Sequence, residues 1–241
     1  MPQSIEKQQL PIDWARSRLY LFGALLVTAC AGGPSPIAPL PLPPLDRAEW
    51  NVWVDAYRPT EPLLYDLRWT YATQQGQSRG RAAIRFVPPD SVRFDYRGPF
   101  RRSGAAMIVG DSVRWVVPEE EVGALVEMTP LFWAMAGVPR PAPAGFTLTG
   151  LDEGARQVWR FAGWTDTLTF DLAIDGSTPR FRGQMRRGGE LIGAVESRFE
   201  DSGGRVISGE LRFPQSAALF SVTFAEVSAL TEINDSIWKE P

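Results

Sequence analysis

The chain has 241 residues, with 25 lysines and arginines, 28 aspartates and glutamates, and no histidine. A formal charge of −3 with mixed signs does not favour a nucleic-acid partner, because binding to phosphates needs a basic face. Without histidine, Ser-His triads, Cys-His dyads and histidine-ligated metal sites are excluded. One cysteine leaves no partner for a disulfide within this sequence. Stability must therefore come from burial of apolar surface.

The stretch that ends at Cys30 has the pattern of a secretory signal. Arg16 and Arg18 precede an apolar run, and small residues lead from that run to the cysteine. The run is much shorter than the about 20 residues that a membrane-spanning helix needs. Its end, Val27-Thr28-Ala29-Cys30, resembles a bacterial lipobox. The resemblance implies a signal peptide at residues 1–29, cleavage before Cys30 and lipidation of the Cys30 thiol.

The residues after Cys30 indicate the membrane to which the lipoprotein is sorted and a spacer between that membrane and the folded domain. Ala31 resembles the default outer-membrane address of Gram-negative lipoproteins, which implies a lipid-anchored protein of the cell envelope, on the periplasmic face of the outer membrane. Prolines recur every second or third residue up to Pro44, which disfavours helix and favours an extended chain. Residues 30–45 are therefore predicted to be a proline-rich tether. Docking of a proline-recognising partner is the alternative interpretation.

The first helix is predicted at Asp46–Tyr57. Asp46 can cap it and Pro59 prevents its continuation. Trp50, Val54 and Tyr57 share one face at helical spacing. Two interpretations remain open: the apolar face packs on a sheet, or it covers a cavity as a lid.

From Leu63 onward the apolar residues alternate with polar ones, which is the pattern of strands with one buried face. Hairpin turns are indicated by Gly110-Asp111, Gly188-Gly189 and Gly203-Gly204. The strands are predicted at Leu63–Tyr71, Ala82–Phe86, Val92–Arg97, Ala106–Val109, Val113–Val117, Phe146–Leu151, Gln157–Trp164, Thr167–Ile174, Arg180–Arg186, Leu191–Phe199, Arg205–Phe213 and Phe220–Val227.

One apolar segment, Val122–Gly137, interrupts this alternation. Three glutamates precede it, as is favourable at a helix start, and Gly137 can end it. Pro130 predicts two short helices or one kinked helix. Residues 231–241 have a weaker pattern and are predicted to form a C-terminal tail.

A sheet of about a dozen strands, each solvent-exposed on one face and apolar on the other, cannot remain flat. We therefore expect a mainly β fold, a strongly curved antiparallel sheet (an unclosed β-barrel) with a helical lid or plug. A β-sandwich is the competing arrangement, but it does not require an apolar helical pair in mid-chain.

The order of these segments is similar to the LolA/LolB-like lipoprotein-localisation family. A short helix precedes the strands, Ser91–Phe100 ends in a turn, a Gly-Asp hairpin follows, and Leu131–Pro139 comes next. The resemblance covers residues 46–230, and the lipidated start is similar to the receptor LolB rather than to the soluble carrier LolA. It implies a concave aromatic cavity for acyl chains, and the reception or insertion of lipoproteins at the outer membrane. The implied partners are acyl chains or lipoproteins, the membrane and a periplasmic carrier protein.

The resemblance and the alternation together give the candidate residues. Phe100, with Arg101 and Arg102, matches by position the family's protruding loop and is expected to contact the membrane; the alternative places Phe100 in the core. Bulky residues in the mid-chain helix leave a second function open, an interaction or scaffold lipoprotein whose cavity is filled by its own side chains. The expected cavity residues are Trp69, Phe86, Phe94, Tyr96, Trp115, Phe132, Trp133 and Phe170.

No catalytic or cofactor site is predicted. Asp152, Glu153 and Asp166 fall in predicted turns, where solvated charge explains them. The glutamates at 119–121 are explained by a helix start rather than by a metal, and the glycine pairs are hairpin turns rather than phosphate loops. We therefore expect a binding protein and not an enzyme.

Overall fold

The computed structural model describes residues 37, 41–110, 112–119, 128–140, 144–173, 180–200, 205–231, 233 and 238–240. These residues belong to one compact unit, Pro36–Pro241. The predicted signal peptide, Cys30, most of the tether and residues 122–127 of the mid-chain helical segment lie outside the described residues.

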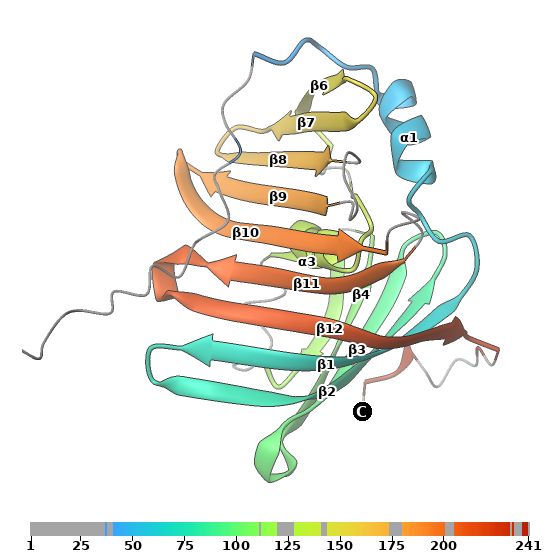
Figure 1. Cartoon of the computed structure of the whole chain (residues 1–241), viewed down its shortest axis with the longest axis vertical. Helices are drawn as coiled ribbons and strands as arrows, with labels where there is room; N and C mark the ends of the chain where they lie inside the picture. Colours follow the sequence, from blue (N-terminus) through green and yellow to red (C-terminus); the bar gives the residue numbers. More distant parts are fainter. Residues whose placement is uncertain are drawn as a thin grey trace, which may run out of the picture. The chain divides into compact units, whose positions relative to one another are not determined.

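Twelve strands form one antiparallel sheet, and all twelve predicted strands are present (Figure 1). The spatial order is β5-β4-β3-β2-β1-β12-β11-β10-β9-β8-β7-β6. The chain thus forms two meanders that meet where β1 pairs with β12. The strands are β1 (Leu63–Thr73), β2 (Gly76–Val87), β3 (Ser91–Arg97), β4 (Ser103–Val109), β5 (Ser112–Val117), β6 (Thr147–Asp152), β7 (Arg156–Ala162), β8 (Asp166–Ala173), β9 (Arg180–Arg187), β10 (Glu190–Phe199), β11 (Val206–Phe213) and β12 (Ala218–Ala229).

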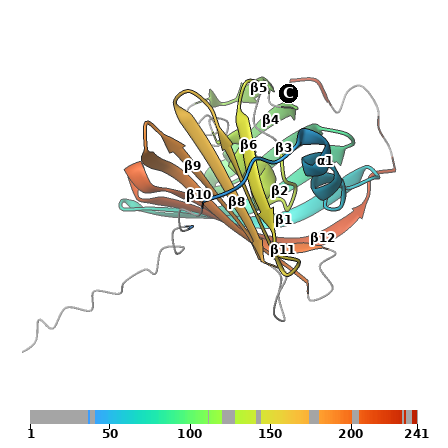
Figure 2. The same ribbon diagram turned by 90° about the horizontal axis from the view of Figure 1, so that it is seen from above.

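The sheet is strongly curved and does not close, because the end strands β5 and β6 do not pair with each other. Figure 2 shows the strands β1–β5 bending away from the plane of β8–β12, so that the two parts enclose a concave side. Residues on that side alternate with exposed ones, for example buried Tyr65, Leu67 and Trp69 on β1. The predicted fold class is confirmed, and a β-sandwich is excluded because there is one sheet rather than two.

Helix α1 (Arg47–Asp55) covers the concave side at the β6 end of the sheet (Figure 1). The Asp46 carboxylate accepts a hydrogen bond of 2.6 Å from the Ala48 N–H, as its capping role predicts. Trp50 packs against Trp159 and Phe161, with ring centroids 4.8 and 5.0 Å away. Of the two interpretations, packing on the sheet is therefore the one that the structure supports for this helix.

The end of the predicted tether belongs to the sheet. The Leu45 N–H donates to the Leu148 carbonyl at 3.1 Å, and the Gly150 N–H donates to the Pro43 carbonyl at 2.9 Å. Pro44 lies between them, opposite Thr149. Because proline lacks an N–H, this segment covers the open edge of β6 without offering a new edge for pairing.

Residues Trp238 and Lys239 attach to the outer face of the β3–β5 part. The Trp238 carbonyl accepts a hydrogen bond of 3.2 Å from the Trp115 indole, and the Lys239 carbonyl accepts one of 2.9 Å from Arg93. Within the described part of the chain, no helix combines the length and apolar character needed to cross a bilayer. That part also contains no group of three or more His, Cys, Asp or Glu residues placed to hold a metal ion.

Candidate functional site

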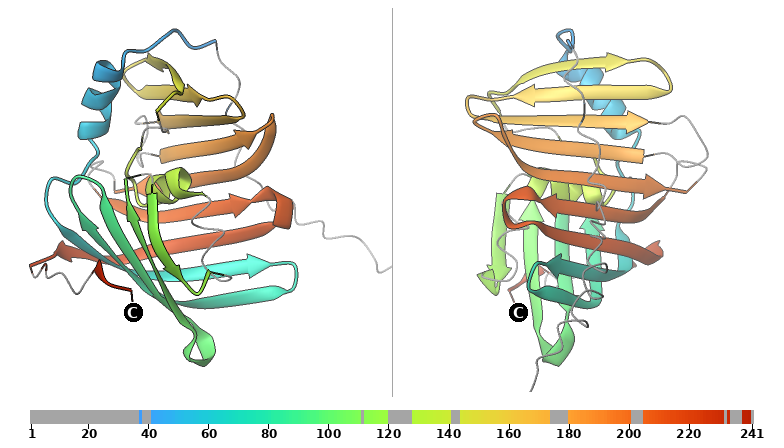
Figure 3. Two further views of the ribbon diagram at one scale, coloured as in Figure 1. Left: turned by 180° about the vertical axis from the view of Figure 1, so that it is seen from behind. Right: turned by 60° about the vertical axis from the view of Figure 1, so that its left-hand side comes forward.

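Helix α3 (Thr129–Met135) lies on the concave side, between β10–β11 and the β2–β4 strands (Figure 3, left). Pro130 stands in its first turn, where a missing N–H costs nothing. Leu131, Phe132 and Trp133 are each at most 2% exposed, and so are Ala134 and Met135. The helix is therefore buried all round and plugs the trough, as its apolar sequence predicts.

Two glycines in the strands allow α3 to lie this close to the sheet. A Cβ atom at Gly209 of β11 would lie 2.5 Å from the Met135 Cγ and 2.7 Å from the Met135 carbonyl. A Cβ atom at Gly193 of β10 would lie 2.8 Å from the Leu131 Cδ1. These positions leave no room for a side chain, so the closed position of the helix depends on both glycines.

The last carbonyls of α3 are held by the sheet as well. The Ser197 hydroxyl, which is fully buried on β10, lies 2.7 Å from the Ala134 carbonyl and 3.2 Å from the Met135 carbonyl. Gly137 follows with a φ of +80° and donates its N–H to the Ala134 carbonyl at 2.9 Å. A helix end leaves carbonyls without partners, and Ser197 and Gly137 supply them here.

On its other side α3 contacts the β2–β3 strands through aromatic rings. Phe132 packs edge to face on Phe94 at 5.5 Å, and Trp133 does the same on Phe86 at 5.8 Å. The Arg140 guanidinium lies 5.1 Å from the Trp133 ring centroid. The plug therefore joins both parts of the curved sheet, and its removal would expose apolar surface on each.

Of the eight expected cavity residues, two belong to this plug and four lie around it, and all six are buried. Trp69 contacts Tyr96 at 5.8 Å, and Tyr96 contacts Phe94 at 6.2 Å. Phe170 also faces the concave side, but it packs on Trp159 at 5.8 Å in the cluster beneath α1. The structure thus brings together Trp69, Phe86, Phe94, Tyr96, Phe132 and Trp133.

The expectation that Trp115 faces the concave side is wrong. Ile108 pairs with Val113, whereas the next pair along β4–β5 is Met107 with Trp115, so Arg114 is the extra residue of a β-bulge. The bulge reverses the alternation, which turns Trp115 to the outer face beside Arg93. The Arg93 guanidinium lies 5.2 Å from the Trp115 ring centroid.

A cavity of about 350 Å³ opens beside the C-terminal end of α3, between the sheet and residues 56–59, which follow α1. This volume lies within the range of about 300–1,000 Å³ that is usual for small-molecule sites. Two arginines, Arg58 and Arg205, stand among otherwise mostly apolar residues. The lining residues are Ala56, Tyr57, Arg58, Pro59, Leu63, Tyr65, Ala136, Gly137, Val138, Phe199, Arg205, Val206 and Val227.

Arg58 lines this cavity, and its guanidinium is hydrogen-bonded only in part. Its Nη1 lies 3.2 Å from the Asp55 carboxylate. Its Nε is buried and, within the part of the chain that the structure describes, has no hydrogen-bond partner. A buried donor without an acceptor costs about 1–3 kcal/mol, but this Nε has almost no accessible surface, so a ligand oxygen would reach it only after the Arg58 side chain turned toward the cavity.

Tyr65 lines the same cavity, and the burial of its phenol predicts how the stability depends on pH. Burial raises the pKa of the Tyr65 phenol from 10.0 to about 12. Since the folded-state pKa is raised, the stabilisation is full below pH 10 and is lost as the pH rises toward 12. In this window we expect the free energy of unfolding to fall by up to about 1.4 kcal/mol per pH unit. Urea unfolding at pH 9 and pH 11 should show a smaller decrease in the free energy of unfolding for the Tyr65→Phe variant than for the wild type. Equal decreases in the two proteins would contradict this prediction.

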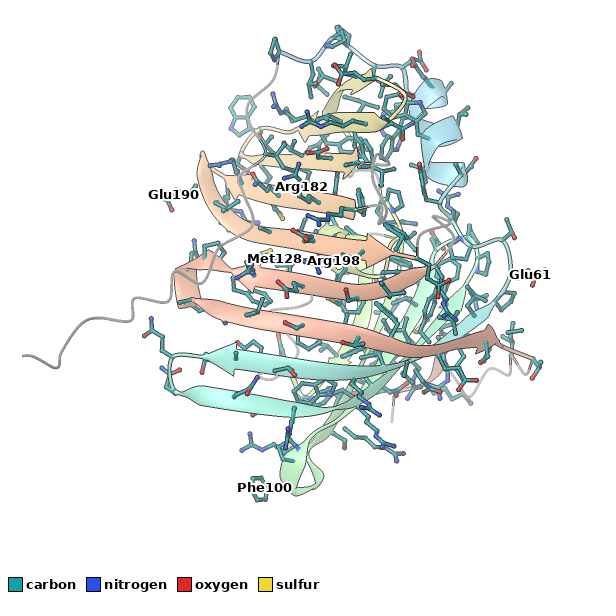
Figure 4. All side chains as sticks on the ribbon, in the orientation of Figure 1. Glu61, Phe100, Met128, Arg182, Glu190 and Arg198 are labelled. Carbon is teal, nitrogen blue, oxygen red and sulfur yellow. The ribbon has the colours of Figure 1, made fainter. Side chains whose placement is uncertain are left out.

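Phe100 is 96% exposed, so the alternative that it folds into the core is wrong. It lies in the short turn η1 (Pro99–Arg101) between β3 and β4, and its φ of 56° is left-handed. In Figure 4 its ring extends beyond the end of the sheet. Arg102 is exposed beside it, whereas the side chain of Arg101 lies outside the description. Trp164, in the turn between β7 and β8, is likewise fully exposed.

No protein-family model matches the sequence, and no curated protein matches it either. Among solved structures, a LolA superfamily protein from Nitrosomonas europaea superposes with a TM-score of 0.52 and 11% identity, over 78% of this chain and 94% of that chain. This chain has a LolA/LolB-like fold. A DUF1329 family protein from Desulfovibrio piger, with a TM-score of 0.47 and 8% identity, covers 80% of this chain and 96% of its own. At these identities the similarity concerns the fold alone.

Sequence reasoning missed three residues that hold the plug in position within this LolA/LolB-like fold. Gly193, Gly209 and Ser197 all lie inside predicted strands, where glycine is unfavourable unless another element approaches closely. That signal was available in the sequence. The lining of the cavity gave no comparable signal, because its residues come from six separate segments of the chain.

Proposed function

We propose that this protein is a lipid-anchored protein of the bacterial envelope that receives acyl chains of lipoproteins, as LolB-like proteins of this fold would. The observation that carries the proposal is the cavity beside α3, whose walls are mostly apolar and include the Arg58 side chain. Apolar walls favour a hydrocarbon chain by about 25 cal/mol per Å² of buried surface. A turn of the Arg58 side chain toward the cavity would bring a donor to an ester carbonyl at the head of that chain. Binding, rather than catalysis, is what this arrangement supports.

The aromatic residues around α3 give the proposed site a second part. Leu63 lines the cavity and pairs across β1–β2 with Phe86, which contacts Trp133. A chain that enters beside α3 would therefore reach the interior aromatic residues when the helix shifts. Lipidation of Cys30 and contact of Phe100, Arg101 and Arg102 with the membrane complete the proposal, and they place the protein at the periplasmic face of the outer membrane.

A scaffold lipoprotein with a self-filled interior is the second candidate. The burial of all five residues from Leu131 to Met135 favours it, because the plug occupies the concave side in this structure. The two candidates differ in one property, which is whether an acyl chain ever enters beside α3.

Photo-crosslinking in cells that express the full chain tests this property. Leu63 is replaced by a diazirine amino acid of about the size of leucine, which does not fill the cavity, and the cells are fed an alkynyl fatty acid that labels acyl chains. We expect irradiation to give alkyne-labelled adducts larger than the protein itself. The same replacement at Val52, which is 70% exposed on α1, is the control and should give none. Absence of adducts at position 63 would favour the scaffold. A Leu63→Trp variant, with the crosslinker moved to Val227, should lower the yield severalfold by filling the cavity.

A further inference from the structure

Three arginines stand side by side on the outer face of β1, β2 and β3. Arg68 pairs directly with Arg81, and Arg81 pairs directly with Arg97. All three are exposed and point away from the concave side, since their chain neighbours Trp69, Ala82 and Tyr96 are buried there. Like charges directly opposite each other destabilise a sheet. We call these three residues the arginine row.

Elsewhere in the sheet, two opposed pairs of arginines each have at least one carboxylate partner. Arg85 and Arg93 are paired across β2–β3, and Asp95 lies 2.6 Å from one and 2.8 Å from the other. Arg180 and Arg198 are paired across β9–β10, and Glu196 lies 3.4 Å from Arg198. The arginine row has no such partner: within the described residues, no ion pair joins a carboxylate to any of its members. Asp66, two residues before Arg68, is on the same face but makes no ion pair with the row.

A hollow of about 570 Å³ adjoins the row on this face. Arg81 and Arg97 line it on one side, together with Ser103. Arg85 and Arg93 also line it and share one carboxylate, that of Asp95, and Asp66 is a further lining residue. Four arginines thus stand against two aspartates, so the hollow keeps a net positive charge, which suits an anion, and Arg81 and Arg97 are the two arginines without an ion pair among the described residues.

The position of the row relative to Phe100 indicates the source of the anion. Phe100 follows Arg97 by three residues, a separation of at most about 10 Å along the chain. The headgroup layer on each side of a bilayer is about 5–8 Å thick. When Phe100 reaches the hydrocarbon boundary, the row lies at the level of the lipid phosphates. Figure 4 shows Phe100 at the end of the sheet, beyond the strands that carry the row.

We propose that Arg68, Arg81 and Arg97 bind the phosphate of an anionic phospholipid headgroup. One guanidinium group can donate hydrogen bonds to two phosphate oxygens at once. A bound phosphate would also relieve the repulsion between the three arginines of the row. The site holds the β3–β4 turn on an anionic bilayer, so that the membrane contact does not depend on Phe100 alone. This inference rests on the proposed function only in taking a membrane as the surface that Phe100 faces.

Calorimetric titration of the full-length protein in dodecyl maltoside micelles tests the site. The titrants are dihexanoyl phosphatidylglycerol below its micellar concentration, dihexanoyl phosphatidylcholine and inorganic phosphate. We expect saturable binding of phosphatidylglycerol, and at least about a tenfold weaker affinity in the Arg81→Gln/Arg97→Gln variant. The Arg180→Gln/Arg198→Gln variant changes the net charge equally, at another opposed pair, and should bind as the wild type does.

Three results would overturn the proposal: equal losses in the two double variants, phosphatidylcholine binding as tight as phosphatidylglycerol, or inorganic phosphate binding as tight as the lipid. The Leu63→Trp variant separates this site from the acyl-chain cavity. It should leave the phosphatidylglycerol titration unchanged while it lowers the crosslinking yield. Failure of either test therefore leaves the other interpretable.

Discussion

Replacing Gly209 with valine is expected to push α3 off the sheet and to lower the free energy of unfolding by about 1–3 kcal/mol. The new Cβ would meet both the Met135 Cγ and the Met135 carbonyl, at 2.5 and 2.7 Å. Because one of these atoms belongs to the backbone, a rotamer change of Met135 cannot relieve the contact. The helix itself must move, and it can move only away from β11. Urea unfolding followed by far-ultraviolet circular dichroism measures the loss.

A matched control lies one residue earlier on the same strand. Ser208 faces the outer side, so Ser208→Val introduces the same side chain without a contact to α3 and should change the stability little. Met135→Ala in the Gly209→Val background removes the Cγ contact but not the carbonyl contact, and should restore only part of the stability. If Gly209→Val and Ser208→Val had equal effects, the glycine would not determine the position of the helix.

The strands of this fold could be predicted from sequence because their signal is local. Alternation of apolar and polar residues, as in Leu63 to Tyr71, needs no knowledge of distant segments. Curvature followed from the number of one-sided strands, and the buried plug from the all-round apolar character of Leu131–Met135. Because alternation is a local signal, it also led to the wrong face for Trp115. A bulge at Arg114 depends on the partner strand, and alternation within one strand cannot reveal it.

The candidate site was predictable only in part, since it arises from non-local geometry. The residues predicted for the cavity are the aromatic residues that the plug covers, whereas the open space lies beside the helix end. It forms where Tyr57, Leu63, Val138 and Val206, from four segments far apart in the sequence, come together. The arginine row was invisible for a similar reason. Its three members become neighbours only through the register of β1, β2 and β3.

Replacing Trp133 with alanine should have the largest effect on both stability and binding. The indole is 1% exposed, and removal of a buried aromatic side chain costs about 3–5 kcal/mol. The space it leaves borders Phe86, which pairs with Leu63 in the wall of the cavity. If acyl chains enter beside α3, the enlarged cavity should raise the crosslinking yield at position 63 despite the lower stability. Loss of stability and gain of binding are then opposite effects of one substitution.

Trp50→Ala separates these two effects. Trp50 is also 1% exposed, and its indole nitrogen, like that of Trp133, lacks a hydrogen-bond partner within the described residues. Its cluster lies beneath α1 and includes Trp159 and Phe161, so the space it leaves does not border Phe86. We expect a similar loss in urea unfolding and no gain in crosslinking. A gain in both variants would mean that loosening of the fold, rather than space beside α3, admits the chain. A gain in neither would mean that the interior is filled for stability alone, as in a scaffold protein.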